Sequence, residues 1–396
     1  MSHIENTQQF YVICQPGFET ELEVELREFW PYLIDAKARP QSQGFKIINI
    51  DHGGILIETF AILAYQINFF SKIASRVLER VSEFRVRDFP KLKAKFEKIN
   101  LDSKFGKNAF QLEVAASKSR LNNEKRISEI AHSVWKNISQ EADFSVHIRM
   151  YDDTCTVSVD TSGPHLHFRY DKSKSSNESK WIGEAPIRET IAAFMVRKLI
   201  KDCSVDELAQ IALLDPMAGS GTLLSEAHNL YQPRFVEREY SFQKFISCPK
   251  TLKATQLSQN FPKFYKLFKN IIASDNEEKM ISILNQNLKL IVGSDHLKIV
   301  KNDLFIENNL LNISKDKLWI IVNPPYGERL SLVKGFQFLG QALSSIGAER
   351  IGIVVPVKEV TQLQSGMKFY KLDSKWAFRN GGIPVEFLVF IKREVL

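Results

Sequence analysis

The sequence predicts an α/β protein in which a mostly parallel sheet follows two small α+β domains. Three observations support this fold class. Short apolar runs alternate with helical stretches after residue 181, strand patterns with hairpin turns occupy the first 165 residues, and the polar run 171–180 separates the two regions. A chain of 396 residues is long enough for two or three domains, each with a core of its own.

The N-terminal region is expected to form two domains, residues 1–71 and 72–165. The first is predicted to contain strands at 10–14, 45–50 and 55–58 and a helix at 17–29. The second is predicted to contain strands at 109–115, 144–150 and 154–160 and a helix at 123–135. The segments Asp51-His52-Gly53-Gly54 and Asp152-Asp153 are typical of the turns between paired strands. Residues 166–180 are the expected linker, because the run from 171 to 180 has no apolar side chain.

Residues 181–396 are expected to form the third domain. Its apolar strands are predicted at 211–214, 271–274, 297–301, 318–322 and 350–355, and a helix at 185–199 precedes them. Continuous apolar strands joined by helices indicate a parallel sheet that is covered on both faces. Since ligands of such sheets bind beyond the carboxyl ends of the strands, the residues after each strand are the candidates for a site.

A glycine turn follows the first of these strands. The segment from Asp215 to Thr222 reads Asp-Pro-Met-Ala-Gly-Ser-Gly-Thr and opens a helix at Thr222. It is not a phosphate-binding Walker A loop, because no Lys-Ser/Thr pair follows Gly221, and Leu224 replaces the third glycine of a dinucleotide-binding loop. The segment resembles motif I of the class I methyltransferases that use S-adenosylmethionine.

This resemblance implies a set of cofactor-binding residues. They are Asp215, Pro216, Gly219, Gly221 and Thr222 in the loop, with Asp275 and Asp303 after the second and third strands and Asn323 after the fourth. In the family, the acidic residues at these two positions bind the ribose hydroxyls and the adenine amino group. An Asp at a strand end is also ordinary turn usage, so each acidic residue carries weight only together with the glycine loop.

The fourth strand is followed by Asn323-Pro324-Pro325-Tyr326, which matches the catalytic tetrapeptide of amino-methyltransferases. An exocyclic amine is a poor nucleophile, because its lone pair is delocalised into the ring. The side-chain oxygen of Asn323 and the carbonyl of Pro324 can accept hydrogen bonds from the two N–H groups of such an amine. Tyr326 can stack on an extruded base. Two prolines after a strand could also merely end the strand. The motif alone leaves adenine N6, guanine N2 and a protein glutamine amide open as targets.

Positive charge is concentrated in residues 72–126, which contain fifteen Lys/Arg and seven Asp/Glu, a net of +8 against +7 for the whole chain. Basic residues alternate there with phenylalanines, a mixture suited to phosphate contacts. The candidate RNA-binding residues are Arg85, Arg87, Lys91, Lys93 and Lys95. An equally good interpretation is a solvated basic face whose phenylalanines point into a core.

Over its whole length the sequence resembles the THUMP-domain RNA guanine-N2 methyltransferases, most of all the bacterial enzymes that act on 23S ribosomal RNA. The resemblance rests on residues 11–22, on the glycine loop and on Asn323-Pro-Pro-Tyr-Gly-Glu-Arg-Leu330. It implies a ferredoxin-like domain at 1–71, an RNA-binding THUMP domain at 72–165 and a Rossmann-like methyltransferase domain with a seven-stranded sheet at 181–396. RNA is the implied partner and S-adenosylmethionine the cofactor.

Two segments depart from the family. Phe168-Arg169-Tyr170 keeps only part of the usual basic stretch, which leaves open whether Arg169 has a role in RNA contact or in domain packing. Residues 229–270 are an aromatic and basic insertion, interpreted as a helical cover or a wall of the base pocket. Its aromatic residues are Phe235, Phe242, Phe245, Phe261, Phe264 and Tyr265.

Composition narrows the remaining choices. The charged fraction of 25% and mean hydropathy of −0.18 are those of a globular protein, and no signal peptide or membrane span is expected, so the protein is predicted to be cytoplasmic. The four cysteines have neither disulfide nor zinc-site spacing, and no metal is expected. The alternatives to a ribosomal RNA enzyme are a tRNA guanine-N2 methyltransferase, a protein-glutamine methyltransferase and a non-catalytic RNA-binding assembly factor.

Overall fold

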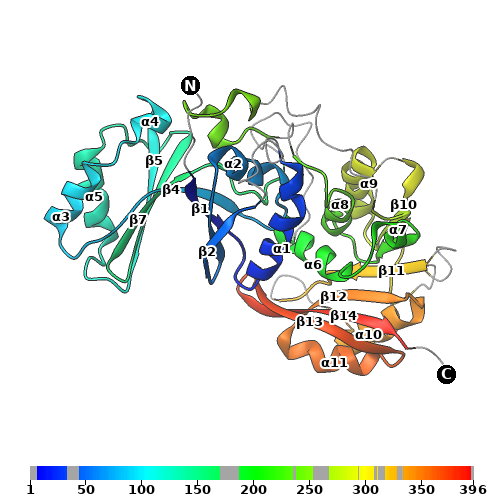
Figure 1. Ribbon diagram of the computed structural model, residues 1–396. Coiled ribbons are helices and arrows are strands. Elements are labelled where there is room, and N and C mark those ends of the chain that lie inside the picture. The colour runs from blue at the N-terminus through cyan, green and yellow to red at the C-terminus, as the bar shows by residue number, and fades with distance from the viewer. Residues whose placement is uncertain are drawn as a thin grey trace. The chain divides into compact units, whose positions relative to one another are not determined.

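The chain folds into two compact units (Figure 1). Unit 1 consists of Met1–Asp171 and Pro233–Pro262, and unit 2 of Lys172–Gln232 and Lys263–Leu396. The computed structural model describes residues 7–33, 44–169, 187–234, 238–252, 267–292, 294–306, 310, 317–327, 332 and 334–393. Among these residues, no helix has the length and apolar character that a membrane span requires.

Unit 1 is built on one seven-stranded sheet of order β2-β3-β1-β4-β7-β6-β5, in which only β5 and β6 run parallel. The strands are β1 (Gln8–Ile13), β2 (Lys46–Asp51), β3 (Gly54–Thr59), β4 (Arg76–Arg85), β5 (Phe110–Ser117), β6 (Phe144–Tyr151) and β7 (Thr154–Asp160). The sheet is continuous because β1 pairs with β4. The regions expected as separate domains, 1–71 and 72–165, therefore share one sheet, and a domain boundary near residue 71 stays a prediction.

The helices of unit 1 are α1 (Glu19–Phe29), α2 (Ala61–Phe70), α3 (Phe89–Phe96), α4 (Asp102–Phe105) and α5 (Glu124–Val134). Of these, α1 and α5 were predicted, whereas α2, α3 and α4 were not. All residues of α2 from Ile62 to Phe70 are buried, so this helix lacks the polar face that makes a helix recognisable by its period. Strand β4 was likewise not predicted. The β2–β3 hairpin lies where it was expected, with Gly53 at a φ of +107° in its turn.

The insertion after α8 packs into unit 1. The rings of Phe242 and Tyr65 stack with centroids 4.9 Å apart, and Phe245 lies against Phe105 and Phe144 at 5.6 and 5.9 Å. These rings belong to the core of the N-terminal unit, so the expected helical cover of the methyltransferase domain is wrong for Phe242 and Phe245. Of the other aromatic residues of the insertion, Phe235, Phe261, Phe264 and Tyr265 lie outside the described residues.

Two buried arginines hold the insertion in place. The Arg238 guanidinium donates to the carbonyls of Ser162, Pro164, His165 and Phe168 at 2.6–3.0 Å. That of Arg234 donates to the carbonyls of Leu166, Ser71 and Asn68. Unpaired buried carbonyls are costly, so these bonds fix the segment to unit 1. The methyltransferase domain was expected to comprise 181–396, but residues 233–262 of that range belong to unit 1 and not to unit 2.

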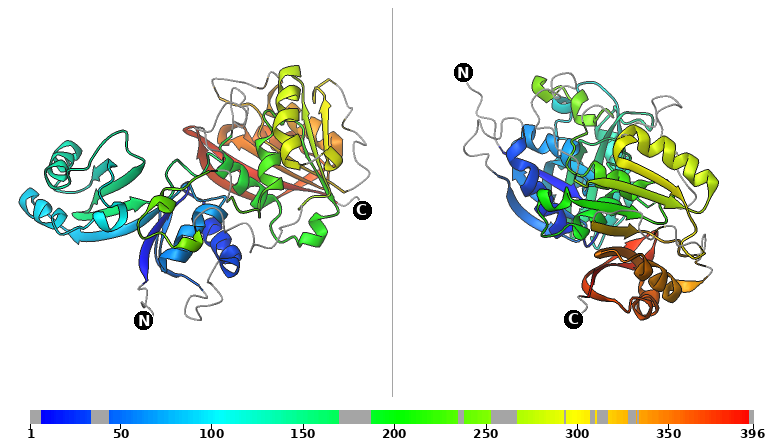
Figure 2. Two further views of the ribbon diagram at one scale, coloured as in Figure 1. Left: turned by 90° about the horizontal axis from the view of Figure 1, so that it is seen from above. Right: turned by 90° about the vertical axis from the view of Figure 1, so that its right-hand side faces the viewer.

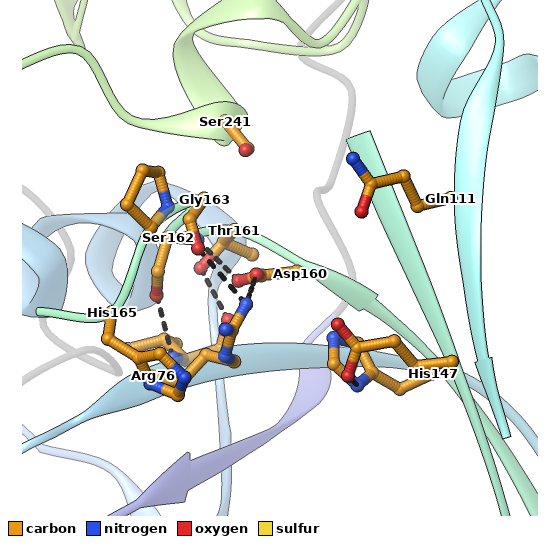
Figure 3. A network of polar contacts seen from close by, with 12 residues as sticks. Arg76, Gln111, His147, Asp160, Thr161, Ser162, Gly163, His165 and Ser241 are labelled. Carbon is orange, nitrogen blue, oxygen red and sulfur yellow. Dashed lines mark hydrogen bonds and ion pairs between the residues drawn. The ribbon is translucent and has the colours of Figure 1, made fainter. Parts of the chain in front are cut away.

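The segment that accepts the Arg238 bonds is itself held by a buried polar network (Figure 3). Asp160 is fully buried, forms an ion pair with Arg76 and accepts a hydrogen bond from the Ser162 backbone N–H at 2.7 Å. Gly163 follows with a φ of +77°, and a Cβ there would stand 2.9 Å from the Ser241 Oγ. A side chain at position 163 would therefore collide with the insertion, so this position requires glycine.

Arg169 is part of the same packing. Its guanidinium is buried and donates to the carbonyls of Leu166 and Lys72 at 2.8 and 2.9 Å. Of the two roles left open for Arg169, packing is the one that the structure displays. Residues 166–169 of the expected linker thus pack within unit 1, and residues 170–180 lie outside the described part of the chain.

Unit 2 contains a mostly parallel seven-stranded sheet of order β10-β9-β8-β11-β12-β14-β13, which confirms the predicted fold class. The strands are β8 (Ile211–Asp215), β9 (Asn270–Asp275), β10 (Leu297–Lys301), β11 (Lys317–Val322), β12 (Arg350–Pro356), β13 (Tyr370–Asn380) and β14 (Ile383–Lys392). Only β14 runs antiparallel, to both β12 and β13.

Helices cover both faces of this sheet (Figures 1 and 2). They are α6 (Glu189–Leu199), α7 (Val205–Leu208), α8 (Thr222–His228), α9 (Glu278–Val292), α10 (Gly335–Ile346) and α11 (Val360–Gly366). Residues Leu339 and Leu343 of α10 pack with the buried strand residues Leu214, Ile320 and Ile353. Burial on both faces explains why these strands read as continuous apolar runs.

Candidate active site

Four polar residues lie at the carboxyl ends of adjacent parallel strands. Asp215 and Asp275 are the last residues of β8 and β9, while Asp303 and Asn323 follow β10 and β11 within two residues. The strand register places Leu214 opposite both Ile272 and Ile320, so the strands end at the same edge. The chain order reverses between β8 and β11, and such a switch point is where open α/β sheets bind ligands.

The two glycines of the loop after β8 have different structural tasks. Gly219 has a φ of +52°, and apart from its chain neighbours no atom of the described residues lies within 4 Å of the place where its Cβ would be. Gly221 has a φ of +81°, and a Cβ there would lie 3.0 Å from the Leu288 Cγ on α9. Gly219 therefore leaves backbone open to a ligand, whereas Gly221 lets α8 and α9 pack closely. Pro216 and Thr222, which are buried, flank the loop.

Asp275 joins the glycine loop to the neighbouring strand. Its Oδ2 accepts a hydrogen bond from the Gly219 N–H at 2.9 Å, and its Oδ1 accepts one from the Glu277 N–H at 3.0 Å. Each carboxylate oxygen has two acceptor positions, so capacity for ligand hydroxyl groups remains. Asp303 is half-buried and accepts from the Phe305 N–H at 2.8 Å, which fixes the turn after β10.

Burial changes the ionisation of the Asp215 carboxyl group at this edge. It is 1% exposed, and burial raises its pKa to about 8, with a smaller contribution from the nearby Asp275 carboxylate. One backbone hydrogen bond, from the Met217 N–H at 3.1 Å, opposes this shift without cancelling it. At neutral pH the group is therefore largely protonated in the ligand-free protein.

The loop Asn323–Gly327 carries an acceptor without a donor. The Asn323 Oδ1 is buried and has no hydrogen-bond partner within the described ranges. Pro324 is buried, and the half-buried Tyr326 ring packs on the apolar core that contains Val322. An unpaired buried acceptor costs about 1–3 kcal/mol, and a donor supplied by a ligand removes that cost. Glu328, Arg329 and Leu330 lie outside the described residues.

Two residues of this edge escaped the sequence analysis. Asn302, directly before Asp303, is 2% exposed, and neither its Oδ1 nor its Nδ2 has a partner in the part of the chain that the structure describes. Its position at a strand end was the signal that could have singled it out. Asn380 donates to the Tyr326 hydroxyl from a strand more than fifty residues further along, and no local pattern points to that contact.

The five candidate RNA-binding residues lie together in unit 1. Arg85 ends β4, Arg87 follows it, and Lys91, Lys93 and Lys95 lie on α3; all five are exposed. Arg87 forms an ion pair with Asp153 at 2.7 Å, and Lys91 forms one with Asp88 at 3.2 Å. Phe96 and Phe105 are buried core residues, as the interpretation of this stretch as a solvated basic face requires. The exposed charges remain available to a polyanion.

The strand order and the residues at this edge define unit 2 as a class I methyltransferase fold. Residues 179–352 match the family model described as the RMKL-like methyltransferase domain, UPF0020, so the resemblance of this domain is confirmed. The ribosomal RNA large subunit methyltransferase K/L of Aliivibrio fischeri strain MJ11 is 30% identical over 369 residues, covering 84% of this chain and 48% of that protein. The chain spans about half the length of the curated relatives it matches.

Solved structures share the fold of the whole chain. A possible methylase from Clostridium difficile 630 superposes with a TM-score of 0.74 at 20% identity, covering 99% of this chain and 100% of that one. The putative methyltransferase SMU.472, solved in complex with SAH, gives the same score, identity and coverage. The arrangement of an N-terminal unit before a methyltransferase fold therefore recurs in known structures.

Proposed function

We propose that the protein transfers a methyl group from S-adenosylmethionine to the exocyclic N2 amine of a guanine in 23S ribosomal RNA. The observation that carries this proposal is the buried, unpaired Asn323 Oδ1 at the same sheet edge as the glycine loop. An acceptor without a donor at this place suits a planar NH2 group. The names of the curated relatives, ribosomal RNA large subunit methyltransferases, support an RNA target.

The residues of the edge fit the cofactor. Gly219 leaves room for close approach of a ligand, and the Asp275 and Asp303 carboxylates can accept hydrogen bonds from ribose hydroxyls and an adenine amine. Asp215 is buried at the start of the glycine loop, and its ionised carboxylate would favour the binding of a cationic ligand. When bound, S-adenosylmethionine supplies an activated methyl group on a sulfonium. The SAH complex of SMU.472 supports the same class of ligand for this fold.

The chain's own contribution to the reaction is to hold and orient the amine. The Asn323 Oδ1 and the Pro324 carbonyl would accept its two N–H groups and favour the pyramidal nitrogen of the transition state. The two prolines restrict the backbone that carries these acceptors. Tyr326 would stack on the base that bears the amine, a contact of about 1–3 kcal/mol.

We infer that unit 1 holds the RNA, with residues 72–165 in the role of a THUMP domain. The exposed cations on α3 and at the end of β4 support this assignment, because counterion release from phosphates requires accessible positive charge. The protein-glutamine alternative leaves this basic surface unexplained. A tRNA substrate and a non-catalytic assembly factor are distinguished by the experiment below.

The test is methyl transfer from radiolabelled S-adenosylmethionine to unmodified 23S RNA and to tRNA transcripts, followed by mass spectrometry of the nucleosides. We expect N2-methylguanosine in 23S RNA. Asn323→Ala should lower kcat by about a hundredfold, the typical effect of removing one transition-state acceptor or donor, while the cofactor Kd stays within about threefold. Asn285→Ala is the matched control, since that amide donates to its own helix. Product on tRNA, adenine or protein, or no product, would overturn the assignment.

A further inference from the structure

The loop Asn323–Gly327 contacts the hairpin of β13 and β14, which lies at one edge of the sheet of unit 2. Strands β13 and β14 are joined by Gly381 and Gly382, with φ values of +57° and +86°, and Asn380 pairs with Ile383 across this turn. Two successive positive φ values are those of the tight turn that matches the twist of paired strands. Asn380 therefore occupies a position that the strand pairing fixes.

Two contacts connect this turn to the loop. The Asn380 Nδ2 donates to the Tyr326 hydroxyl at 2.7 Å. Next to Tyr326, Gly327 has a φ of +90°, and a Cβ there would come within 2.8 Å of the Ile383 Cδ1. The two strand residues that flank the turn thus each meet one of two adjacent loop residues. Residues 323–326 have no regular secondary structure, so contacts of this kind must fix the direction of the Tyr326 side chain.

We propose that Asn380 is a positioning residue that sets the plane of the Tyr326 ring and thereby the register of the target base against Asn323. This inference rests on the proposed function. A hydrogen bond at the hydroxyl restrains the ring at its tip and leaves the ring face clear for stacking. Since a stacked base lies parallel to that ring, the angle of the ring decides where the exocyclic amine meets its acceptors. Preorganisation of this kind lowers the entropy that binding must otherwise remove.

Kinetics of three variants test the proposal. Asn380→Ala and Tyr326→Phe each break the hydrogen bond and keep the aromatic ring, so each should lower kcat about tenfold, the equivalent of one hydrogen bond of about 1.4 kcal/mol. Because the stacking surface remains, the RNA KM should change less than about threefold. The double variant should be no slower than the slower single variant, since one interaction is lost in all three cases.

A conservative variant separates positioning from a merely structural role. The carboxylate of Asn380→Asp can accept a hydrogen bond from the Tyr326 hydroxyl, so it should restore kcat to within about threefold of wild type. Asp373→Asn, an exposed change on the same strand, is the control and should be neutral. Asn380→Ala with more than half of wild-type kcat, or single-variant losses that multiply in the double variant, would overturn the proposal.

A spectroscopic readout does not depend on turnover. The Asn380 hydrogen bond lowers the pKa of the Tyr326 hydroxyl, which burial raises, so Asn380→Ala should raise that pKa further. Tyrosine labelled with 13C at Cζ reports the change by NMR, and Tyr326→Phe assigns the resonance. An unchanged Tyr326 titration in Asn380→Ala would refute the contact. If wild type yields no methylguanosine while the pKa shifts as expected, the proposed function fails and the contact stands.

Discussion

Replacing Asp215 by Asn should change how stability depends on pH. In the unfolded chain this carboxyl releases its proton near the ordinary aspartate pKa of 3.8, whereas burial in the native protein raises that pKa to about 8. The native state therefore binds up to one more proton throughout this window. The stability contributed by the group is fully present below pH 4 and is lost as the pH rises to 8.

The size of the effect follows from the pKa. A difference of one proton changes the free energy of unfolding by about 1.4 kcal/mol per pH unit. Asn is nearly isosteric with the protonated acid and does not ionise. From pH 5.5 to 7.5, the free energy of unfolding of Asp215→Asn should therefore increase by about 2.5 kcal/mol relative to that of wild type.

Urea denaturation of both proteins at several pH values measures this difference, and comparing the two removes contributions from all other groups. Asp206→Asn, at an exposed position on α7, is the control. A cationic cofactor favours the ionised Asp215, so the affinity for S-adenosylmethionine should also rise toward pH 8 in wild type and not in the variant. If the wild-type and variant stabilities run parallel from pH 5.5 to 7.5, the carboxyl is not protonated and the reasoning is refuted.

Three further sets of substitutions test the proposed RNA-binding surface, the insertion and the Asn302 amide. Neutralising Lys91, Lys93 and Lys95 together should weaken RNA binding and flatten its salt dependence, measured by filter binding at several salt concentrations; an unchanged slope would contradict the RNA role. Arg238→Met removes four hydrogen bonds to backbone carbonyls and should lower the free energy of unfolding of unit 1 by about 3–5 kcal/mol, which a loss under 1 kcal/mol in denaturation would contradict. Asn302→Leu should stabilise the ligand-free protein in thermal melts yet weaken cofactor binding in calorimetry, whereas unchanged binding would make Asn302 a purely structural residue.

The sheet of unit 2 illustrates what local sequence predicts well. Strands β8 to β12 were predicted to within about two residues, because burial on both faces leaves continuous apolar runs between helical stretches. The same order placed Asp215, Asp275 and Asn323 at one sheet edge. In unit 1, α2 was missed for the converse reason, since a helix buried on all sides has no polar face to give it a period.

The sequence by itself determined the class of the C-terminal fold, the edge that carries the candidate site and the position of the basic block, since strand burial, turn chemistry and charge are properties of neighbouring residues. Only the tertiary structure places residues 233–262 in the N-terminal unit, raises the pKa of the buried Asp215 and brings Asn380 into contact with Tyr326. Each of these depends on groups far apart along the chain: the carbonyls that Arg238 reaches, the burial that removes water from a carboxyl, and a hairpin turn that meets a loop. The energies of these interactions depend on desolvation and on three-dimensional geometry, which a local segment of sequence does not specify.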